Sequence, residues 1–305
     1  MRIFYNEQFN IDLGLLNYLH PFDGTKFRKV VNDIKNLEHI VIDTSAAPIS
    51  TNTINEFLNE LMEMMVIEKK FICRALEIPH LPFISFNYLD KKILYPMRLG
   101  VGNTLAASKA ALKGEDCWNL AGGYHHASQH NSEGFCIYND IGIAYQELIK
   151  SGMLTNSDCI LIIDTDAHHG NGNARTFKEN TNITLLDVYN RSIYPMTETT
   201  RERVDIAVPL TSGVTGDEYL SKFEAALQQV TSDYKIAYIV AGTDVLESDP
   251  LGQMMLSLDD VVQREKMTLK RLKDLGIPAV FLGGGGYSKE SAKTISATIK
   301  AVSAL

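Results

Sequence analysis

Short apolar runs that end abruptly in polar or glycine-rich segments constrain this chain more than any other feature. They are rich in β-branched residues and lie at 39–43 (HIVID), 159–164 (CILIID), 183–189 (ITLLDVY), 236–242 (IAYIVAG) and 278–286 (PAVFLGGGG). A run that is apolar at almost every position is typical of a strand buried on both faces. The fold therefore needs other elements that pack against both faces of the sheet.

Helix-length amphipathic stretches lie between these runs, at 53–72, 103–113, 139–151, 216–231 and 258–275. Alternating strands and helices predict an α/β fold with a mostly parallel sheet and helices on both faces. No repeat, low-complexity tract or Pro/Gly/Ser-rich linker divides the sequence, so we expect one domain spanning residues 1–305. Ligands of such sheets bind at the carboxyl ends of the strands.

Charge and cysteine content exclude several classes of partner. The net charge of −8 disfavours nucleic acid, whose backbone is bound by clustered Lys and Arg, and mildly favours a cationic substrate. The four cysteines form no CxxC pair, which fits a reducing cytosol. The amino terminus has no signal-peptide pattern and no apolar run reaches membrane-spanning length, so we expect a cytoplasmic protein without a membrane span.

Histidines are concentrated in two segments. AGGYHHA (121–127) and IDTDAHHGNG (163–172) hold four of the eight histidines in the chain. A lone His-His pair is more often two ordinary surface or core residues. Two such pairs, each after a predicted strand or a glycine turn, favour a functional site instead.

Three side chains after the predicted strands form a candidate metal site. Residues two apart at a strand end point to the same side, so Asp166 and His168 are predicted to converge, with Asp164 behind them. A catalytic zinc keeps three protein ligands and one open position, and Asp244, after the run 236–242, is the candidate third ligand. For any one of these carboxylates, a helix cap is the simpler interpretation.

The glycine run 283–286 ends in Tyr287. It lacks the Gly-Lys-Ser/Thr ending of a P-loop, and Ser288 stands where a dinucleotide fingerprint needs glycine. There is also no GxSxG nucleophile elbow. The remaining interpretations are a flexible turn, or a tight turn that brings the phenol of Tyr287 to the strand ends.

Together these segments resemble the zinc-dependent histone deacetylase family, which includes acetylpolyamine amidohydrolases. The resemblance spans nearly the whole chain and rests on ordered motifs: AGGYHHA, GFCIYND (134–140), DTDAHHGNG, GTDVLESDPLG and GGGGY. Within the family, YLHPFDGTKF (18–27), DVYNRSIYP (187–195) and the Asn of HHGNG look most like the class IV branch. The lack of tails and of a basic import cluster suggests a compact prokaryotic enzyme.

The resemblance implies an arginase/deacetylase fold with about eight strands and a narrow tube leading to the metal. It implies three zinc ligands, Asp166, His168 and Asp244, with Fe²⁺ as a substitute because the set is rich in oxygen. It implies catalytic roles for His125, His126, Tyr287, Asp164 and Asn171. It also implies that Phe135 and Tyr194 form opposite walls of the tube, which Gly123 and Leu251 line.

The chain departs from the family pattern at several positions. Asn171 replaces the second aspartate found in many members, so only His125 is expected to have a carboxylate partner, Asp164. Leu185 stands near the position where family members have a serine that helps bind a structural potassium ion, which puts a K⁺ site in doubt. The segment ISTNTINEF (49–57) lacks the histidine usual there.

The predicted activity is metal-dependent hydrolysis of acylated lysine side chains. Acetylpolyamines or other small acylated amines are the alternative within this chemistry, and an inactive acyl-lysine binding module is a remote one. The segment 77–89 (EIPHLPFISFNYL) is apolar and aromatic where the family has a rim loop, and we expect it, with Phe83, to favour medium or long acyl chains. Oligomeric state and physiological substrate stay open.

Overall fold

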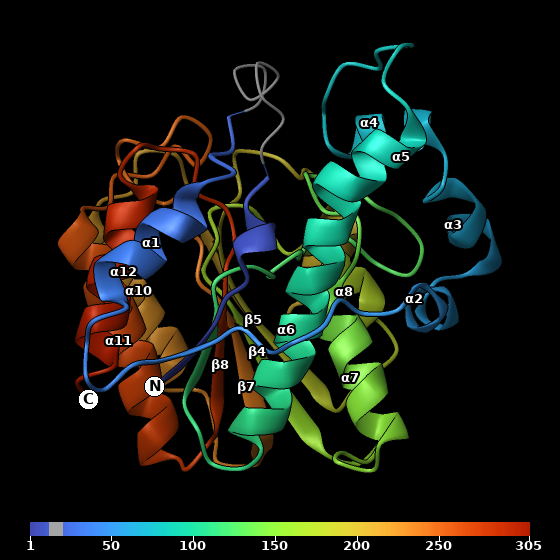
Figure 1. Cartoon of the computed structure of the whole chain (residues 1–305). Coiled ribbons are helices and arrows are strands. Elements are labelled where there is room, and N and C mark those ends of the chain that lie inside the picture. Colours follow the sequence, from blue (N-terminus) through green and yellow to red (C-terminus); the bar gives the residue numbers. More distant parts are fainter. Residues whose placement is uncertain (12–20) are drawn as a thin grey trace.

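A parallel sheet of eight strands forms the centre of the part of the chain that the computed structural model describes, residues 1–11 and 21–305 (Figure 1). The strand order is β2-β1-β3-β8-β7-β4-β5-β6, and every neighbouring pair is parallel. The strands are β1 (Arg2–Phe4), β2 (Val41–Asp43), β3 (Cys117–Asn119), β4 (Cys159–Asp164), β5 (Ile183–Asn190), β6 (Ile206–Leu210), β7 (Tyr234–Val240) and β8 (Ala279–Leu282). The predicted fold class is confirmed.

All five predicted runs contain a strand, but three strands were missed. β1 and β3 have only three residues each, too few to show a periodic pattern. β6 contains Pro209, which argues against a strand in the middle of a sheet. β6 is the edge strand and pairs with β5 alone, and an edge strand is where a sheet tolerates proline.

The central strands are buried on both faces. Alternate residues of β4 belong to two different hydrophobic clusters: Leu161 and Ile163 to one, Ile160 and Ile162 to the other. This division follows from the two-residue period of a strand. The continuous apolar run CILIID therefore serves two cores at once.

Two groups of helices cover these cores, one on each side of the sheet (Figure 1). One face packs against α1 (Lys26–Ile34), α10 (Gly216–Leu227), α11 (Leu258–Asp274) and α12 (Ser291–Val302). The other packs against α6 (Tyr95–Ala111) and α7 (Asp140–Lys150), with α8 (Asn171–Thr176) beside them. Shorter helical segments are η1 (Glu7–Phe9), α5 (Phe86–Leu89), η3 (Asp90–Leu94) and α9 (Glu198–Arg201).

The prediction of one continuous helix at 53–72 is wrong. The chain forms three short helices there, α2 (Thr51–Phe57), α3 (Glu60–Met65) and α4 (Lys69–Ala75). Leu58 is extended after α2, and the side chain of Asn59 then caps α3 by accepting a hydrogen bond from the N–H of Met62. The spacing of apolar residues alone predicts one continuous helix, but the asparagine cap starts a new one.

Two further predictions can be compared with the structure only within the described ranges. Residues 18–20, with which the segment compared with class IV begins, lie outside them. Of the helices within them, none is both long and apolar enough to cross a membrane.

Candidate active site

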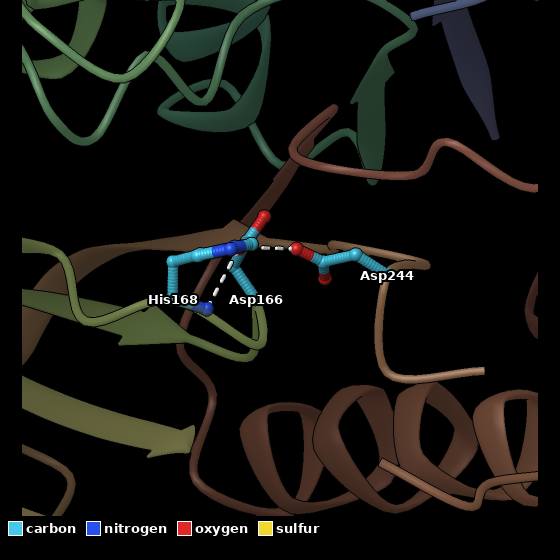
Figure 2. Close-up of side chains that lie close together, drawn as sticks. All are labelled: Asp166, His168 and Asp244. Atoms are coloured by element: carbon cyan, nitrogen blue, oxygen red, sulfur yellow. Dashed lines mark hydrogen bonds and ion pairs between the residues drawn. The ribbon is translucent and has the colours of Figure 1, made fainter. Parts of the chain in front are cut away.

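The three predicted metal ligands meet at the carboxyl ends of two adjacent strands. β4 and β7 are neighbours in the sheet, so the loop with Asp166 and His168 begins beside the loop with Asp244. One donor atom of each side chain lies within 4.8 Å of the other two, and all three residues are buried (Figure 2). Strand alternation, however, is the wrong reason for this convergence, because β4 ends at Asp164. A turn sets the directions instead, in which the N–H of His168 donates to Oδ1 of Asp166 at 3.0 Å.

Backbone N–H groups hold the two carboxylates. Gly285 donates to Oδ2 of Asp166 at 2.5 Å, and Ala167 donates to Oδ1 of Asp244 at 2.9 Å. A Cβ at position 285 would lie 2.4 Å from Oδ2 of Asp244, so only glycine allows this approach. The glycine run is therefore part of the site and not merely a flexible turn.

The donor set fits a divalent cation. Nδ1 of His168 lies 3.1 Å from Oδ1 of Asp166 and 2.8 Å from Oδ2 of Asp244. Burial, and then the charge of Asp166, raise the pKa of Asp244 to about 7. Two buried carboxylates that face one imidazole nitrogen need positive charge between them, and two oxygens with one nitrogen suit Zn²⁺ or Fe²⁺.

The loop after β3 carries the histidine pair. The N–H groups of Gly123 and Tyr124 donate to the buried Asp140 carboxylate at 3.0 and 2.8 Å, which fixes the loop against the start of α7. Gly123 has φ +70°, and a Cβ there would lie 2.9 Å from the carbonyl oxygen of Gly283. The rings of His125 and His126 lie 4.1 Å apart, centroid to centroid.

The two histidines have different partners, as their motifs predicted. Nδ1 of His125 lies 2.8 Å from Oδ2 of Asp164, and Nδ1 of His126 lies 2.7 Å from Oδ1 of Asn171. Burial opposes the charged form of His125, but the Asp164 and Asp166 carboxylates outweigh it and raise its pKa to about 9. Burial, and then the charges of His125 and His168, hold the pKa of His126 well below its ordinary value.

The loop after β8 brings Tyr287 to the same place. Its N–H donates to Oδ2 of Asp249 at 2.7 Å, and its ring packs edge-on against Phe135, 5.7 Å between centroids. Burial, and then the nearby Asp166 and Asp244 charges, raise the pKa of Tyr287 well above its ordinary value. The phenol therefore stays neutral and available as a hydrogen-bond donor.

An apolar cavity of about 120 Å³ adjoins these groups. His125, His126 and Tyr287 line it on the side of the candidate metal site. Its other walls are largely carbon: Phe9, Ile11, Phe22, Phe27, Leu76, Ile78, Ile93, Pro96 and Met97.

The predicted tube residues are not all in this cavity. Gly123 and Phe135 line it. Tyr194 lies over His126 instead, 5.2 Å between ring centroids, and is 40% exposed. Leu251 is absent from the lining, and its N–H donates to Oδ1 of Asp249 at 3.0 Å. The structure thus brings two of the four predicted residues together at this cavity.

Several residues near the site escaped the sequence analysis. Lys26 is buried and donates to the carbonyls of Gly284 and Gly286 at 3.5 and 3.3 Å; burial lowers its pKa to about 8. Arg264 is buried under the ligand loops and donates to the carbonyls of Thr165 and Gly242. The carbonyls of Gly284, Gly286 and Thr165 are about a hundred or more positions away from the lysine or arginine that contacts them, so no local pattern marks these contacts.

A comparison with protein families decides which family the chain belongs to. The model of the histone deacetylase domain matches residues 20–302. The chain belongs to the histone deacetylase family. The matched range includes all of the motifs that carry the resemblance. The chain is a hydrolase of the histone deacetylase type.

Curated proteins that are similar to this chain include one from a plant and one from a bacterium. The chain is 30% identical to histone deacetylase 2 of Arabidopsis thaliana over 99% of its length and 78% of that protein. It is 31% identical to the acetoin utilization protein AcuC of Bacillus subtilis, over 61% of this chain and 51% of that one.

Solved structures support the fold. The histone deacetylase domain of HDA15 has a TM-score of 0.77 at 20% identity, covering 99% of this chain and 87% of that one. A histone deacetylase homologue from Aquifex aeolicus has a TM-score of 0.74, also at 20% identity, and covers 99% and 83%.

Proposed function

We propose that this deacetylase-family protein uses a divalent metal to hydrolyse the amide bond of acylated lysine side chains, with a preference for medium or long acyl groups. The apolar cavity beside His125, His126 and Tyr287 carries this proposal, because it offers buried carbon surface next to the reacting groups. The metal dependence rests on the convergence of Asp166, His168 and Asp244.

Zn²⁺, or Fe²⁺ in its place, would polarise the acyl carbonyl and acidify water when bound by Asp166, His168 and Asp244. His126 is the general base, because its depressed pKa leaves it neutral near pH 7. Its Nε2 takes the proton of the attacking water and then passes that proton to the leaving amine. His125 stays protonated beside Asp164 and supplies positive charge.

Tyr287 stabilises the developing charge on the carbonyl oxygen. Its phenol is neutral and lines the cavity together with both histidines. A donor fixed in place before the reaction stabilises an oxyanion more than water does, since it needs no reorganisation. The hydrogen bonds from the Tyr287 and Ser288 N–H groups to Asp249 supply that fixation.

The acyl preference depends on residues other than the one first expected. Phe83 does not line the cavity and is 83% exposed, so it shelters no acyl carbon. Ile78, from the same rim segment, does line it. Each methylene buried against such walls contributes about 0.8 kcal/mol, so four of them favour a longer chain by roughly a hundredfold.

We also propose a structural K⁺ site beside Asp187. Oδ1 of the buried Asp187 has no hydrogen-bond partner, and Asp187 stands opposite Asp164 in the register of β4 and β5. A bound cation would satisfy that oxygen. Leu185, which stands near the position of a serine in the family, supplies no side-chain oxygen there.

Small acylated amines form the alternative substrate class, and similarity to a protein named for acetoin utilization keeps it in view. The class IV branch, a prokaryotic source and a cytoplasmic location stay predictions.

An activity screen tests the proposed function: acetyl- to myristoyl-lysine peptides beside acetylated polyamines, with the metal-loaded protein. We expect turnover of acyl-lysine that rises with chain length. Turnover of polyamines alone would favour the alternative, and no turnover of either would favour a binding module.

A further inference from the structure

Glu133 contacts the side-chain amide of Asn171, the same amide that faces His126. Nδ2 of Asn171 donates to Oε1 of Glu133 at 2.8 Å, while Oδ1 of the same amide faces Nδ1 of His126 at 2.7 Å. Arg175, one turn along α8 from Asn171, forms an ion pair with the same oxygen of Glu133. The contacts form a chain from His126 through Asn171 to Glu133.

The direction of this chain is set by chemistry. A carboxylate only accepts hydrogen bonds, so Glu133 requires the NH₂ group of Asn171 to point toward it. The carbonyl oxygen of the amide then faces His126, and Nδ1 of His126 must donate. In a neutral imidazole, a proton on Nδ1 leaves Nε2 free to accept one.

An asparagine without such a neighbour would not fix this tautomer. Its amide could turn over and offer NH₂ to Nδ1 of His126, which would place the imidazole proton on Nε2. A base whose outer nitrogen already carries a proton cannot take one from water. Asp164 avoids this ambiguity at His125, because both of its oxygens only accept.

We propose that Glu133 is a positioning residue that fixes the orientation of the Asn171 amide and thereby keeps Nε2 of His126 unprotonated. Position 171 has no carboxylate, and Glu133 supplies one that acts on His126 through the amide of Asn171. The inference rests on the proposed role of His126 as general base. Its anchor is partly buried, with Glu133 and Arg175 side chains 28% and 26% exposed.

An ordinary surface ion pair is the simpler interpretation of Glu133 and Arg175, and such pairs contribute little. The location argues against it, since Asn171 is fully buried and its NH₂ group would lose its acceptor without Glu133. Glu133 also precedes Gly134 and Phe135, which line the cavity.

The decisive test compares Glu133→Ala with the double variant Glu133→Ala/Asn171→Asp in the metal-loaded protein. We expect Glu133→Ala to lower kcat about tenfold or more with KM changed less than about twofold, since a general base contributes between about a hundredfold and ten-thousandfold. The double variant should recover most of this loss at a pH above its own acidic limb, because a carboxylate at position 171 fixes the tautomer unaided. Glu133→Gln keeps an acceptor and should lose less than Glu133→Ala.

Nitrogen NMR of histidine-labelled protein gives a readout that needs no substrate. The wild type should show His126 protonated at Nδ1, and Glu133→Ala should shift protonation toward Nε2. Glu198→Ala removes another glutamate paired with an arginine, Arg201, and should change neither measurement. An unchanged tautomer in Glu133→Ala, or no recovery in the double variant, would overturn the inference. If the protein hydrolyses none of the tested amides, the NMR result still decides it.

Discussion

The backbone N–H of Gly285 lies 2.5 Å from Oδ2 of Asp166. This contact joins the loop after β8, which carries Tyr287, to the loop after β4, which carries two of the proposed metal ligands. One backbone hydrogen bond therefore links the loop of the phenol to the loop of the metal site.

Removal of the metal should abolish activity. A chelator should inactivate the protein, and Zn²⁺ or Fe²⁺ should restore it, because the buried donor atoms of Asp166, His168 and Asp244 converge on one position and a metal bound there would supply the polarising charge. Asp244→Ala should lose metal and turnover together, as measured by elemental analysis and peptide hydrolysis. Asp217→Ala, an exposed carboxylate on α10, is the control. Full metal content in Asp244→Ala would contradict the assignment.

Loss of the Tyr287 hydroxyl should affect kcat more than KM. Tyr287→Phe deletes a hydrogen bond made mainly in the transition state, so kcat should fall about a hundredfold or more. Tyr88→Phe changes a tyrosine of α5 outside the cavity and should leave both constants unaltered. Steady-state kinetics checks this, and an unchanged kcat would place Tyr287 outside the reaction.

The acidic limb of the pH-rate profile should move with the residue at position 171. Turnover is lost as pH falls through the pKa of His126, because protonation removes the base. A carboxylate beside an imidazole favours its charged form and raises its pKa, so Asn171→Asp should shift the acidic limb to higher pH. An unmoved limb in the kcat/KM profile would assign the base elsewhere.

Acyl-chain preference should depend on Ile78 and not on Phe83. Ile78→Asp places a charge in the apolar lining and should reduce the advantage of long over short acyl-lysine in kcat/KM by about tenfold or more. Phe83→Asp changes the same rim segment outside the cavity and is the matched control. A preference for acetyl-lysine in the wild type would defeat this prediction.

The buried Arg264 should be required for stability. Arg264→Leu leaves Glu265 buried without its partner, which should lower the free energy of unfolding by about 3–5 kcal/mol. The exposed pair of Lys222 and Glu218 on α10 gives the comparison, and Lys222→Ala should cost less than about 1 kcal/mol. Urea unfolding followed by circular dichroism measures both.

The sequence by itself determined the type of sheet and the location of its chemistry. Runs such as 159–164 are apolar at every position but the last, and that composition alone requires burial on both faces. The polar residues that follow each run then fall at the carboxyl ends of parallel strands, at one edge of the sheet. Asp166, His168 and Asp244 could therefore be grouped before the structure was known.

Tertiary structure decided which loops meet and which side chains face the site. The order of strands places β7 beside β4, and no local pattern encodes that neighbour. Phe83 and Ile78 share one apolar segment, yet only Ile78 reaches the cavity, because the path of the loop sets their directions. The contact between Glu133 and Asn171 joins the loop after β3 to the start of α8, which follows β4, so it exists only once these strands lie in one sheet.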